Sequence, residues 1–445
     1  MKFSPFFSRV RFGLPALCLL LVFTACETDF TNPNSPTDAQ VLNSREGLLS
    51  LSAGIKQLYS VNGVRWLVET PAITTREAGI TTTFQNMIEL EDGGTELPNF
   101  NSNVSGLWST MLRVVNSSNE LIAGAERVDL AADTRASIIA FANTMKGMAL
   151  GGLAMHYEQI VVEPSLDNMA TFVSRQDGFA AAIAALETAQ STLGSGPTET
   201  FQTVILQGMD LPNTIDAMLA RFHLYAGDFD EAIAAANAVD LSVTSVFDYD
   251  LMNANPIWTR VILNGTPNFK PRDNFGLPED EFAIDSTDGR IAFYLTPDTL
   301  INQNGLPVEN LAGFFATPTS AIPVYLPDEM RLIIAEAELR GNNDTDAALT
   351  QINGVRTGTD VYGLDANLDE YDGDTDVASL LEEIYFQRRL ELFLTGQSLE
   401  DSRRFGRPEP SGQARNYGEE RNRNFYPYPE LERNSNPNTP ADPAI

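Results

Sequence analysis

Cysteine is almost missing from this chain. Its 445 residues include 2 cysteines, Cys18 and Cys26. Cys18 lies inside an apolar leader, so a mature chain that begins at Cys26 keeps a single thiol and cannot form a disulfide within itself. Packing of the core must therefore hold the fold together, and the remaining thiol of a secreted protein needs a use of its own.

Basic residues are also scarce. The chain has 29 Lys and Arg against 60 Asp and Glu. Its leader, residues 1–25, carries three basic residues and no acidic one, so the mature chain has 29 − 3 = 26 basic residues and a net charge of 26 − 60 = −34. A field of that sign repels phosphate backbones and anionic lipid headgroups. Nucleic acid is excluded as a partner, and membrane contact would have to come from a lipid anchor only.

Patterns that carry catalysis or bind cofactors are few. The 2 histidines, His156 and His223, fall on separate predicted helices without His-x-x-x-His spacing, which indicates packed residues rather than metal ligands. The sequence shows neither a Gly-x-Ser-x-Gly elbow nor a phosphate loop. Chance alone supplies pairs of carboxylates in so acidic a chain, so such pairs do not indicate glycoside hydrolysis. We expect no catalytic residue, no metal and no cofactor.

One acidic segment leaves two interpretations open. Residues 369–374 (DEYDGD) could hold calcium, although their spacing departs from that of an EF-hand loop. A solvated acidic loop is the other interpretation.

The amino-terminal residues have the layout of a bacterial secretion signal. Three basic residues precede an apolar run over residues 14–23, which ends in Thr24-Ala25-Cys26. The run is too short to span a bilayer as a stable helix. A cysteine after small residues resembles a lipobox, in which the thiol of the new amino-terminal cysteine takes up a diacylglyceryl group. We expect cleavage before Cys26 and a covalent lipid on it, with an ordinary signal peptide that happens to end at a cysteine as the alternative.

Two short segments follow the leader. Glu27-Thr28-Asp29 resembles the surface-export signal of Bacteroidetes lipoproteins. Residues 26–40, which are rich in proline, asparagine and threonine, are expected to form the lipidated amino terminus and a flexible stalk. The body then occupies residues 41–445. Hydrophobic residues make up 43% of the chain, which predicts a globular fold of one or two domains.

The body is predicted to be mainly α-helical. A first helix is expected over residues 45–59, then loops to about residue 98, then a helix over residues 104–127. Helical pairs follow over residues 133–157 with 176–193, residues 213–226 with 230–239, and residues 329–340 with 344–356. The helical regions are thus expected at about 133–239 and 328–400.

Small residues in these pairs resemble those of tetratricopeptide repeats. In one pair they are Ala220, Gly227 and Ala232, and in another Ala335, Gly341 and Ala348. Such positions let paired helices touch backbone to backbone in a stacked repeat. A generic antiparallel helix bundle is the alternative.

Residues 241–326 break the pattern. They are rich in proline, glycine and aromatic residues, with a β-like run at residues 291–295, and are predicted to form a loop-rich region of a length that often carries function.

Several segments together resemble the SusD/RagB family of outer-membrane nutrient-binding lipoproteins. The most specific is Gln387-Arg388-Arg389-Leu390-Glu391-Leu392, followed by Asp401-Ser402-Arg403-Arg404-Phe405-Gly406. The family usually has glutamate where Gln387 and Thr395 stand, and arginine where Ser398 stands. Further matches lie in order along the chain: LWSTMLRVVNSSNE at residues 107–120, KGMALGGLAMHYEQIVVEP at 146–164, RLIIAEAELR at 331–340, and the closing FYPYPEL at 425–431 with NSNP at 434–437.

The conserved-looking arginines of this motif suit a structural role. Arginine forks hold carboxylates in two-point contact. We interpret Arg388, Arg389, Glu391 and Asp401 as an ion-pair network that locks the last long helix to the irregular tail.

The resemblance places the ligand site in loops, where aromatic rings stack on sugars and polar groups contact their edges. Trp108 is expected in the core, whereas Trp66 and Trp258 are expected in loops. The candidate binding residues are Trp66, Arg76, Trp258, Arg272, Asn274 and Tyr294, each with loop anchoring as the alternative.

The resemblance implies a non-enzymatic, surface-exposed lipoprotein of the outer membrane. Such a protein catches a glycan or an oligopeptide and passes it to a TonB-dependent barrel of the SusC type. A surface adaptor that binds only proteins is one alternative, and a secreted α-helical glycosidase is another. The ligand itself, carbohydrate or peptide, is left open.

Overall fold

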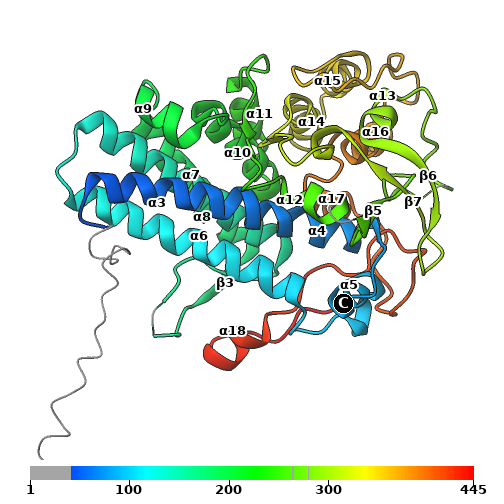
Figure 1. Ribbon diagram of the computed structural model, residues 1–445. Coiled ribbons are helices and arrows are strands. Elements are labelled where there is room, and N and C mark those ends of the chain that lie inside the picture. The colour runs from blue at the N-terminus through cyan, green and yellow to red at the C-terminus, as the bar shows by residue number, and fades with distance from the viewer. Residues whose placement is uncertain (1–41, 166, 263–264, 279) are drawn as a thin grey trace, which may run out of the picture.

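The computed structural model describes residues 42–445 except residues 166, 263–264 and 279. The leader, the stalk and Cys26 lie outside the described residues. Helices form most of the described body, and the short strands gather mainly at one side, next to the carboxyl-terminal helices (Figure 1). This is the mainly α-helical architecture that the sequence predicts.

The first helix is longer than expected. A continuous helical run contains α3 (Arg45–Gln57), the π-helical turn η1 (Leu58–Gly63) and α4 (Val64–Thr74). The threonines and Pro71 near its end suggested a loop. Burial of Val68, Ala72 and Ile73 outweighs their low helix propensity, since tertiary packing routinely overrides propensity.

Three long helices lie beside this run. They are α6 (Ser102–Arg127), α7 (Ala132–His156) and α8 (Arg175–Leu193), close to the predicted boundaries. Helix α7 is apolar and long enough to cross a bilayer, yet 89% of its most apolar window is buried inside the protein. It is therefore the central core helix of this half, packed between α6 and α8.

The predicted repeat pairs are present. One pair is α10 (Leu211–Ala226) with α11 (Phe229–Ala238), and the other is α14 (Pro327–Ala337) with α15 (Thr345–Thr357). All four alanines that the pattern singled out are fully buried between packed helices: Ala220, Ala232, Ala335 and Ala348.

The two pairs turn differently. Gly227 ends α10 with φ of 91°, a left-handed conformation that glycine adopts at low cost. In the second pair α14 continues into the π-helical turn η6 (Glu338–Asn342), and the chain turns at Asn343 with φ of 53° rather than at Gly341.

The region over residues 241–326 is irregular, as expected, but it contains two short helices, α12 (Pro256–Val261) and α13 (Gly289–Tyr294). Residues 291–294 were predicted to be β-like and are helical instead, because Asp288 caps the turn through the N–H of Arg290.

The described part of the chain contains four two-stranded antiparallel sheets. They pair β1 (Ala78–Ile80) with β5 (Phe269–Pro271), β2 (Gln159–Val161) with β3 (Phe172–Ser174), β4 (Val246–Phe247) with β8 (Ile322–Pro323), and β6 (Leu295–Ile301) with β7 (Pro307–Leu311).

The carboxyl-terminal part returns across both helical regions. It contains α16 (Val377–Glu391), α17 (Ser398–Arg404) and α18 (Glu430–Ser435). Smaller elements elsewhere are α5 (Gln85–Asp92), η2 (Gly94–Glu96), α9 (Glu199–Phe201), the π-helical η3 (Gln202–Leu206) and η5 (Gly313–Phe315).

Candidate functional site

Both candidate tryptophans lie on helices rather than in loops. Trp66 is on α4 and Trp258 on α12, and these two helices pack against each other at the front of the molecule (Figure 1). Each indole is half-buried. The prediction that they sit in loops is wrong, yet the fold brings together two segments that are almost 200 residues apart in the sequence.

A buried carboxylate ties these helices together. Glu69 on α4 is fully buried and accepts hydrogen bonds from Arg260 on α12 (Nη2 to Oε1, 2.9 Å) and from Asn103 (Nδ2 to Oε1, 2.9 Å). Arg65 lies 3.7 Å from the same carboxylate, and its guanidinium carbon is 3.9 Å from the Trp66 ring centroid. Cation–π contact and ion pairing together restrict the orientation of the Trp66 ring.

Helix α6 supports the Trp66 ring from below. A Cβ atom built on Gly106 would lie 2.5 Å from Cε2 of Trp66. The glycine therefore permits a close approach that no other residue allows, and the ring rests directly on the helix backbone.

Two exposed phenylalanines lie where helices that pack against α4 begin. Phe84 is 57% exposed at the start of α5 and Phe100 is 62% exposed just before α6. Asn101 donates to the carbonyl of Asn86 (2.8 Å), and so joins the starts of these two helices. We call Trp66, Phe84, Phe100 and Trp258 the aromatic face. Sequence analysis missed both phenylalanines, although bulky rings within a polar, threonine- and asparagine-rich stretch are a signal of surface function.

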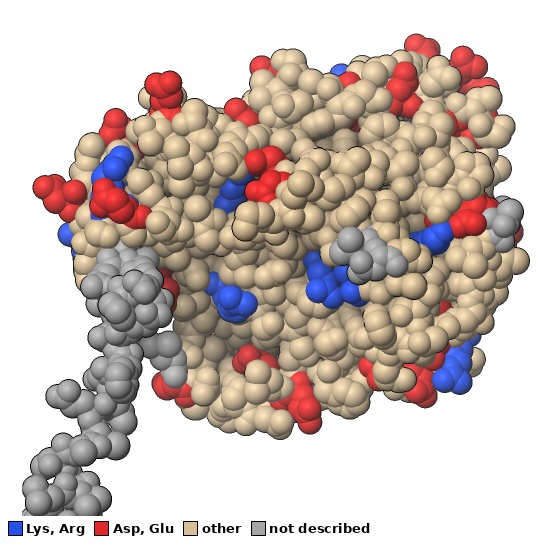
Figure 2. Space-filling view, in the orientation of Figure 1, with Lys and Arg blue, Asp and Glu red and all other residues tan. Residues whose placement is uncertain are grey.

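Charged side chains of both signs are scattered over the side of the molecule on which α3, α4 and α12 lie, with neutral surface between them (Figure 2). At the junction of α4 and α12, Arg65 and Arg260 both pair with the buried carboxylate of Glu69.

Two of the predicted polar ligand contacts are buried. Arg76 is 2% exposed and donates to the carbonyls of Glu91 (2.8 Å) and Asn416 (3.1 Å). Burial lowers its pKa to about 10. Tyr294 is fully buried, and its hydroxyl donates to the carbonyl of Glu391 (3.2 Å). Neither side chain can contact a ligand in solvent, so both assignments are wrong in this structure.

The other two predicted polar contacts, Arg272 and Asn274, also bond the protein itself. The Arg272 backbone N–H pairs with the carbonyl of Glu77 (2.8 Å) beside the β1–β5 sheet, and the Arg272 side chain is buried. Asn274 closes a tight turn by donating to the carbonyl of Leu277 (2.7 Å) and accepting from the N–H of Gly276 (3.1 Å). These contacts give both residues a positioning role in the chain.

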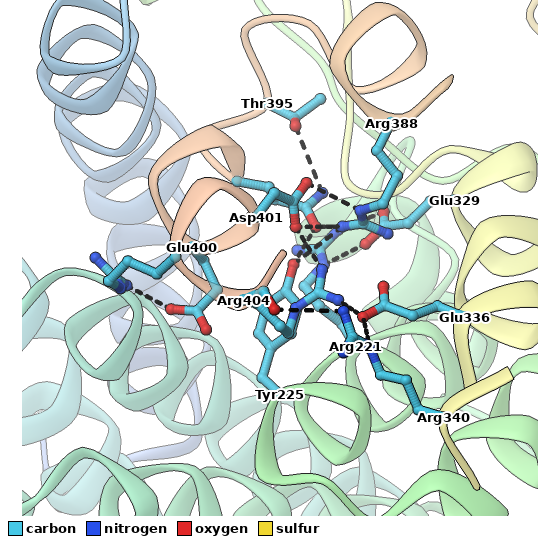
Figure 3. Close-up of polar contacts among 12 residues, drawn as sticks. Arg221, Tyr225, Glu329, Glu336, Arg340, Arg388, Thr395, Glu400, Asp401 and Arg404 are labelled. Carbon is cyan, nitrogen blue, oxygen red and sulfur yellow. Dashed lines mark hydrogen bonds and ion pairs between the residues drawn. The ribbon is translucent and has the colours of Figure 1, made fainter. Parts of the chain in front are cut away.

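Arg388 and Asp401 lie at the centre of a buried charge network (Figure 3). The Arg388 guanidinium donates two parallel bonds to Asp401, at 2.9 and 3.0 Å, and a third to Gln397 Oε1 at 3.2 Å. Arg404 also donates to Asp401 (2.6 Å). The ion pair between Arg388 and Asp401 therefore joins α16 to α17.

The network extends to both repeat pairs. Arg404 pairs with Glu336 on α14, and Arg221 on α10 pairs with Glu329 at the start of α14 (Nη2 to Oε2, 2.7 Å). Tyr225 on α10 lies 3.3 Å from Arg388. The arginine motif therefore anchors the carboxyl-terminal helices to the repeats. It also contacts the irregular tail, as the sequence predicts, but through Arg403, which donates to the carbonyl of Asn424, and Ser402, which accepts from Arg421 (2.9 Å).

Arg389 and Glu391 have other partners. Arg389 donates to the carbonyls of Thr75 (3.1 Å) and Phe275 (2.9 Å) instead of a carboxylate. Glu391 pairs with Arg290 of α13 (3.5 Å), and burial raises the pKa of the Glu391 carboxyl well above its usual range. Sequence spacing could not have shown these partners, because Thr75, Phe275 and Arg290 come from distant segments.

Metal binding finds little support in the described residues. No group of three or more His, Cys, Asp or Glu side chains in them is arranged to hold a metal ion. In the acidic run, Tyr371 donates to the carbonyl of Asp374 (3.1 Å), and Arg356 donates to the carbonyl of Asp369 (2.9 Å), so the loop is held by arginine and backbone contacts.

An internal cavity of about 80 Å³ lies between α4, α7, α10 and α14. Apolar side chains such as Met148, Met155 and Met218 line most of it. Arg221, Glu329 and Gln397 add polar groups to the lining, but a cavity of this size is too small for a sugar ring or a peptide.

Comparison with known proteins supports the family resemblance. Residues 323–442 match the model of the SusD family. Among curated proteins, no match to the chain was found.

Solved structures match nearly the whole chain. A SusD superfamily protein from Bacteroides thetaiotaomicron is 18% identical with a TM-score of 0.68, and the match covers 89% of this chain and 99% of that one. A SusD-like carbohydrate binding protein from Bacteroides fragilis is 14% identical with a TM-score of 0.67, over 90% and 100% of the two chains. NanU from B. fragilis is 13% identical with a TM-score of 0.68, over 93% and 99%. The TM-scores show a shared fold. Together with the match over residues 323–442, they confirm the resemblance to the SusD/RagB family.

Proposed function

From a carboxyl-terminal region that matches the SusD family and a SusD-like fold throughout, we propose that this protein is a non-catalytic glycan-binding protein of the bacterial cell surface. The aromatic face is its ligand-binding surface. The observation that carries the proposal is the placement of Trp66 and Trp258 on helices that pack together, with Phe84 and Phe100 exposed at the starts of two further helices that contact α4.

Rings of this kind suit a sugar chain. A flat ring stacks on the C–H face of a pyranose, and half-buried indoles that are held by their neighbours lose little conformational freedom on binding. One of the similar solved structures, from Bacteroides fragilis, is that of a SusD-like carbohydrate binding protein, which favours a glycan over an oligopeptide here.

The proposal includes the anchor and the transporter. A lipid on Cys26 would tether the body to the outer membrane, facing the exterior, and the glycan would pass to a SusC-like TonB-dependent barrel. Because the chain is strongly acidic, a complementary basic rim on the barrel would speed the encounter of the two proteins.

Substitution of the tryptophans tests ligand binding. In native gels that contain one polysaccharide each, we expect the mature chain to be retarded by at least one of them. Trp66→Ala and Trp258→Ala should each weaken that binding at least tenfold, about 1.4 kcal/mol, as for a stacked aromatic anchor.

The matched control is Val361→Ala. Val361 is 41% exposed in the loop that follows α15, a helix that packs on α14 and α16, so its truncation removes exposed apolar surface away from α4 and α12. Retardation that survives both tryptophan changes, or that Val361→Ala abolishes equally, would rule out the aromatic face as the binding surface.

Gentle detergent extraction tests the transporter partnership. We expect the lipidated protein to co-purify with a large outer-membrane barrel, and a variant with Cys26→Ser to leave the membrane fraction. Recovery of the wild-type protein alone would favour the surface adaptor without a transporter.

A further inference from the structure

A polar crevice lies beside the helical run that carries Trp66. It has a volume of about 260 Å³ and lies between the end of α3, the η3 turn and the loop after β4. Its polar lining comes from Lys56, Gln57, Gln207, Asp248, Asp250 and Asn253.

Two π-helical turns contribute to the walls of the crevice beside α3. Ser60 and Val61 belong to η1, and Val204 and Ile205 belong to η3. Gln207 follows η3 with φ of 52°, a left-handed conformation that costs free energy for a residue with a side chain. Single π-helical turns are rare and are found frequently at functional sites.

The charges in the crevice disfavour a charged ligand. Lys56 is 7% exposed, and its Nζ already lies 2.7 Å from the carbonyl of Leu206, 2.9 Å from Asp248 Oδ1 and 3.4 Å from Gln207 Oε1. It has three protons and three acceptors, so none is left for an anion. Its charge also repels an ammonium group, while Asp248 and Asp250 repel a carboxylate.

The polar atoms that are left offer both kinds of hydrogen bond. The acceptors Asp248 Oδ2 and Gln57 Oε1 and the donor Gln207 Nε2 form no hydrogen bond with the described residues. A sugar hydroxyl donates one bond and accepts others, so adjacent hydroxyls complement such a mixed set. Beside these atoms, Val61, Val204 and Tyr249 supply apolar surface for the C–H face of a ring.

The crevice and the aromatic face share two segments of the chain. Gln57 and Trp66 lie on one helical run, nine residues or about 13 Å apart along its axis. On the other segment, Asn253 precedes α12, which carries Trp258, by a few residues.

We propose that this crevice is a second carbohydrate subsite that holds one neutral sugar ring. The proposal rests on the glycan-binding function proposed above and adds a place where a single ring, rather than an extended chain, is recognised.

Blocking the crevice tests the proposal. Ala53 is an exposed residue of α3 that lines the crevice, and Ala53→Trp would fill it. Gly54 is its neighbour, and a Cβ atom there would meet nothing within 4 Å, so Gly54→Trp places the same bulk outside. The probes are methyl glycosides of glucose, galactose, mannose and N-acetylglucosamine, read by saturation-transfer NMR on the mature chain.

We expect at least one methyl glycoside to bind the wild type and Gly54→Trp equally, and to bind Ala53→Trp at least fivefold more weakly. Glucosamine and glucuronic acid, which are charged, should bind more weakly than their neutral counterparts. Failure of every methyl glycoside to bind, unchanged binding by Ala53→Trp, or preference for a charged sugar overturns the subsite.

Polysaccharide retardation in gels separates this outcome from failure of the proposed function. If Trp66→Ala and Trp258→Ala abolish retardation while no methyl glycoside binds, the aromatic face stands and the crevice proposal is wrong. If retardation is missing in the wild type as well, both proposals fail.

Discussion

Glu77 shows how burial changes the chemistry of one residue. Its carboxyl is 1% exposed beside β1 and accepts a hydrogen bond from the hydroxyl of Ser398 (Oγ to Oε2, 3.0 Å). Burial raises the pKa of this carboxyl to about 7, although the charge of Arg389 and the bond from Ser398 oppose the shift. The folded protein therefore keeps the proton of Glu77 at pH values where the unfolded chain has lost it.

The raised pKa of Glu77 makes stability depend on pH. Between about pH 5 and pH 7 the native state binds one more proton than the unfolded state, so the free energy of unfolding falls with rising pH, by up to about 1.4 kcal/mol per unit. Glu77→Gln replaces the titrating carboxyl by a neutral amide, so its stability does not depend on this proton. Urea unfolding at a series of pH values should show the variant gaining stability relative to the wild type as pH rises from 5 to 7, with no further change above.

All other titrating groups are common to the two proteins, so the difference between them isolates Glu77. A difference in unfolding free energy that stays constant from pH 5 to pH 8 would contradict the assigned pKa.

Residue identities could be predicted better than residue environments. The motif over residues 387–404 indicated that Arg388 and Asp401 belong together, and they form an ion pair. Arg76 and Tyr294 were expected to face a ligand because they are a polar and an aromatic residue in the segments where the family resemblance places the ligand site. Their burial depends on the carboxyl-terminal tail and α16, which supply Asn416 and Glu391 as hydrogen-bond partners from over 90 residues away.

At the scale of elements, glycines set how closely the long helices pack. A Cβ atom on Gly147 of α7 would lie 2.8 Å from Leu186 of α8, and one on Gly151 would lie 2.0 Å from the ring of Phe222 on α10. These glycines let α7 approach two helices at once, which explains how so apolar a helix is buried on nearly every side.

Substitution of helix glycines separates packing from propensity. Gly151→Ala should lower the free energy of unfolding by about 1–3 kcal/mol, because the methyl group overlaps the Phe222 ring in a filled core. Gly54→Ala on α3, where the methyl group meets open space, should raise it by about 0.5–1 kcal/mol through helix propensity. Urea titration of both variants measures the two effects. Equal effects of the two changes would show that α7 and α10 are not closely packed.

Element predictions succeeded where periodicity is strong. The helices α6, α7, α8 and α10 begin and end within about two residues of the predicted limits, because each has a long run with an apolar face or a high alanine content. The helix α4 was missed, since threonine, proline and glycine signals around it outweigh a short apolar pattern whose burial is decided by distant segments. That error hid the relation between Trp66 and Trp258.

At the scale of the whole molecule, the buried charge network joins parts that repeat stacking alone would leave separate. It links α10, α14, α16 and α17, so the carboxyl-terminal helices and the repeats form one body (Figure 3). The aromatic face then rests on α4, α6 and α12, and α17 packs against α4. A rigid body of this kind presents its rings with little rearrangement on binding.

The fold class could be predicted from the sequence because helical periodicity and the SusD-like motifs extend along the whole body. The binding surface could be predicted only in part. Trp66 and Trp258 were selected by residue type, but Phe84, Phe100 and the crevice beside Lys56 depend on contacts between segments that no local pattern shows.

Isothermal titration of the mature chain with a polysaccharide that retards it tests the central claim most directly, because one experiment detects both binding and turnover. The account predicts saturable heats that return to baseline after each injection, and at least a hundredfold weaker binding for the Trp66→Ala, Trp258→Ala double variant, about 2.8 kcal/mol. Equal affinity in the double variant, or a sustained heat flow that reports hydrolysis of the glycan, would contradict it.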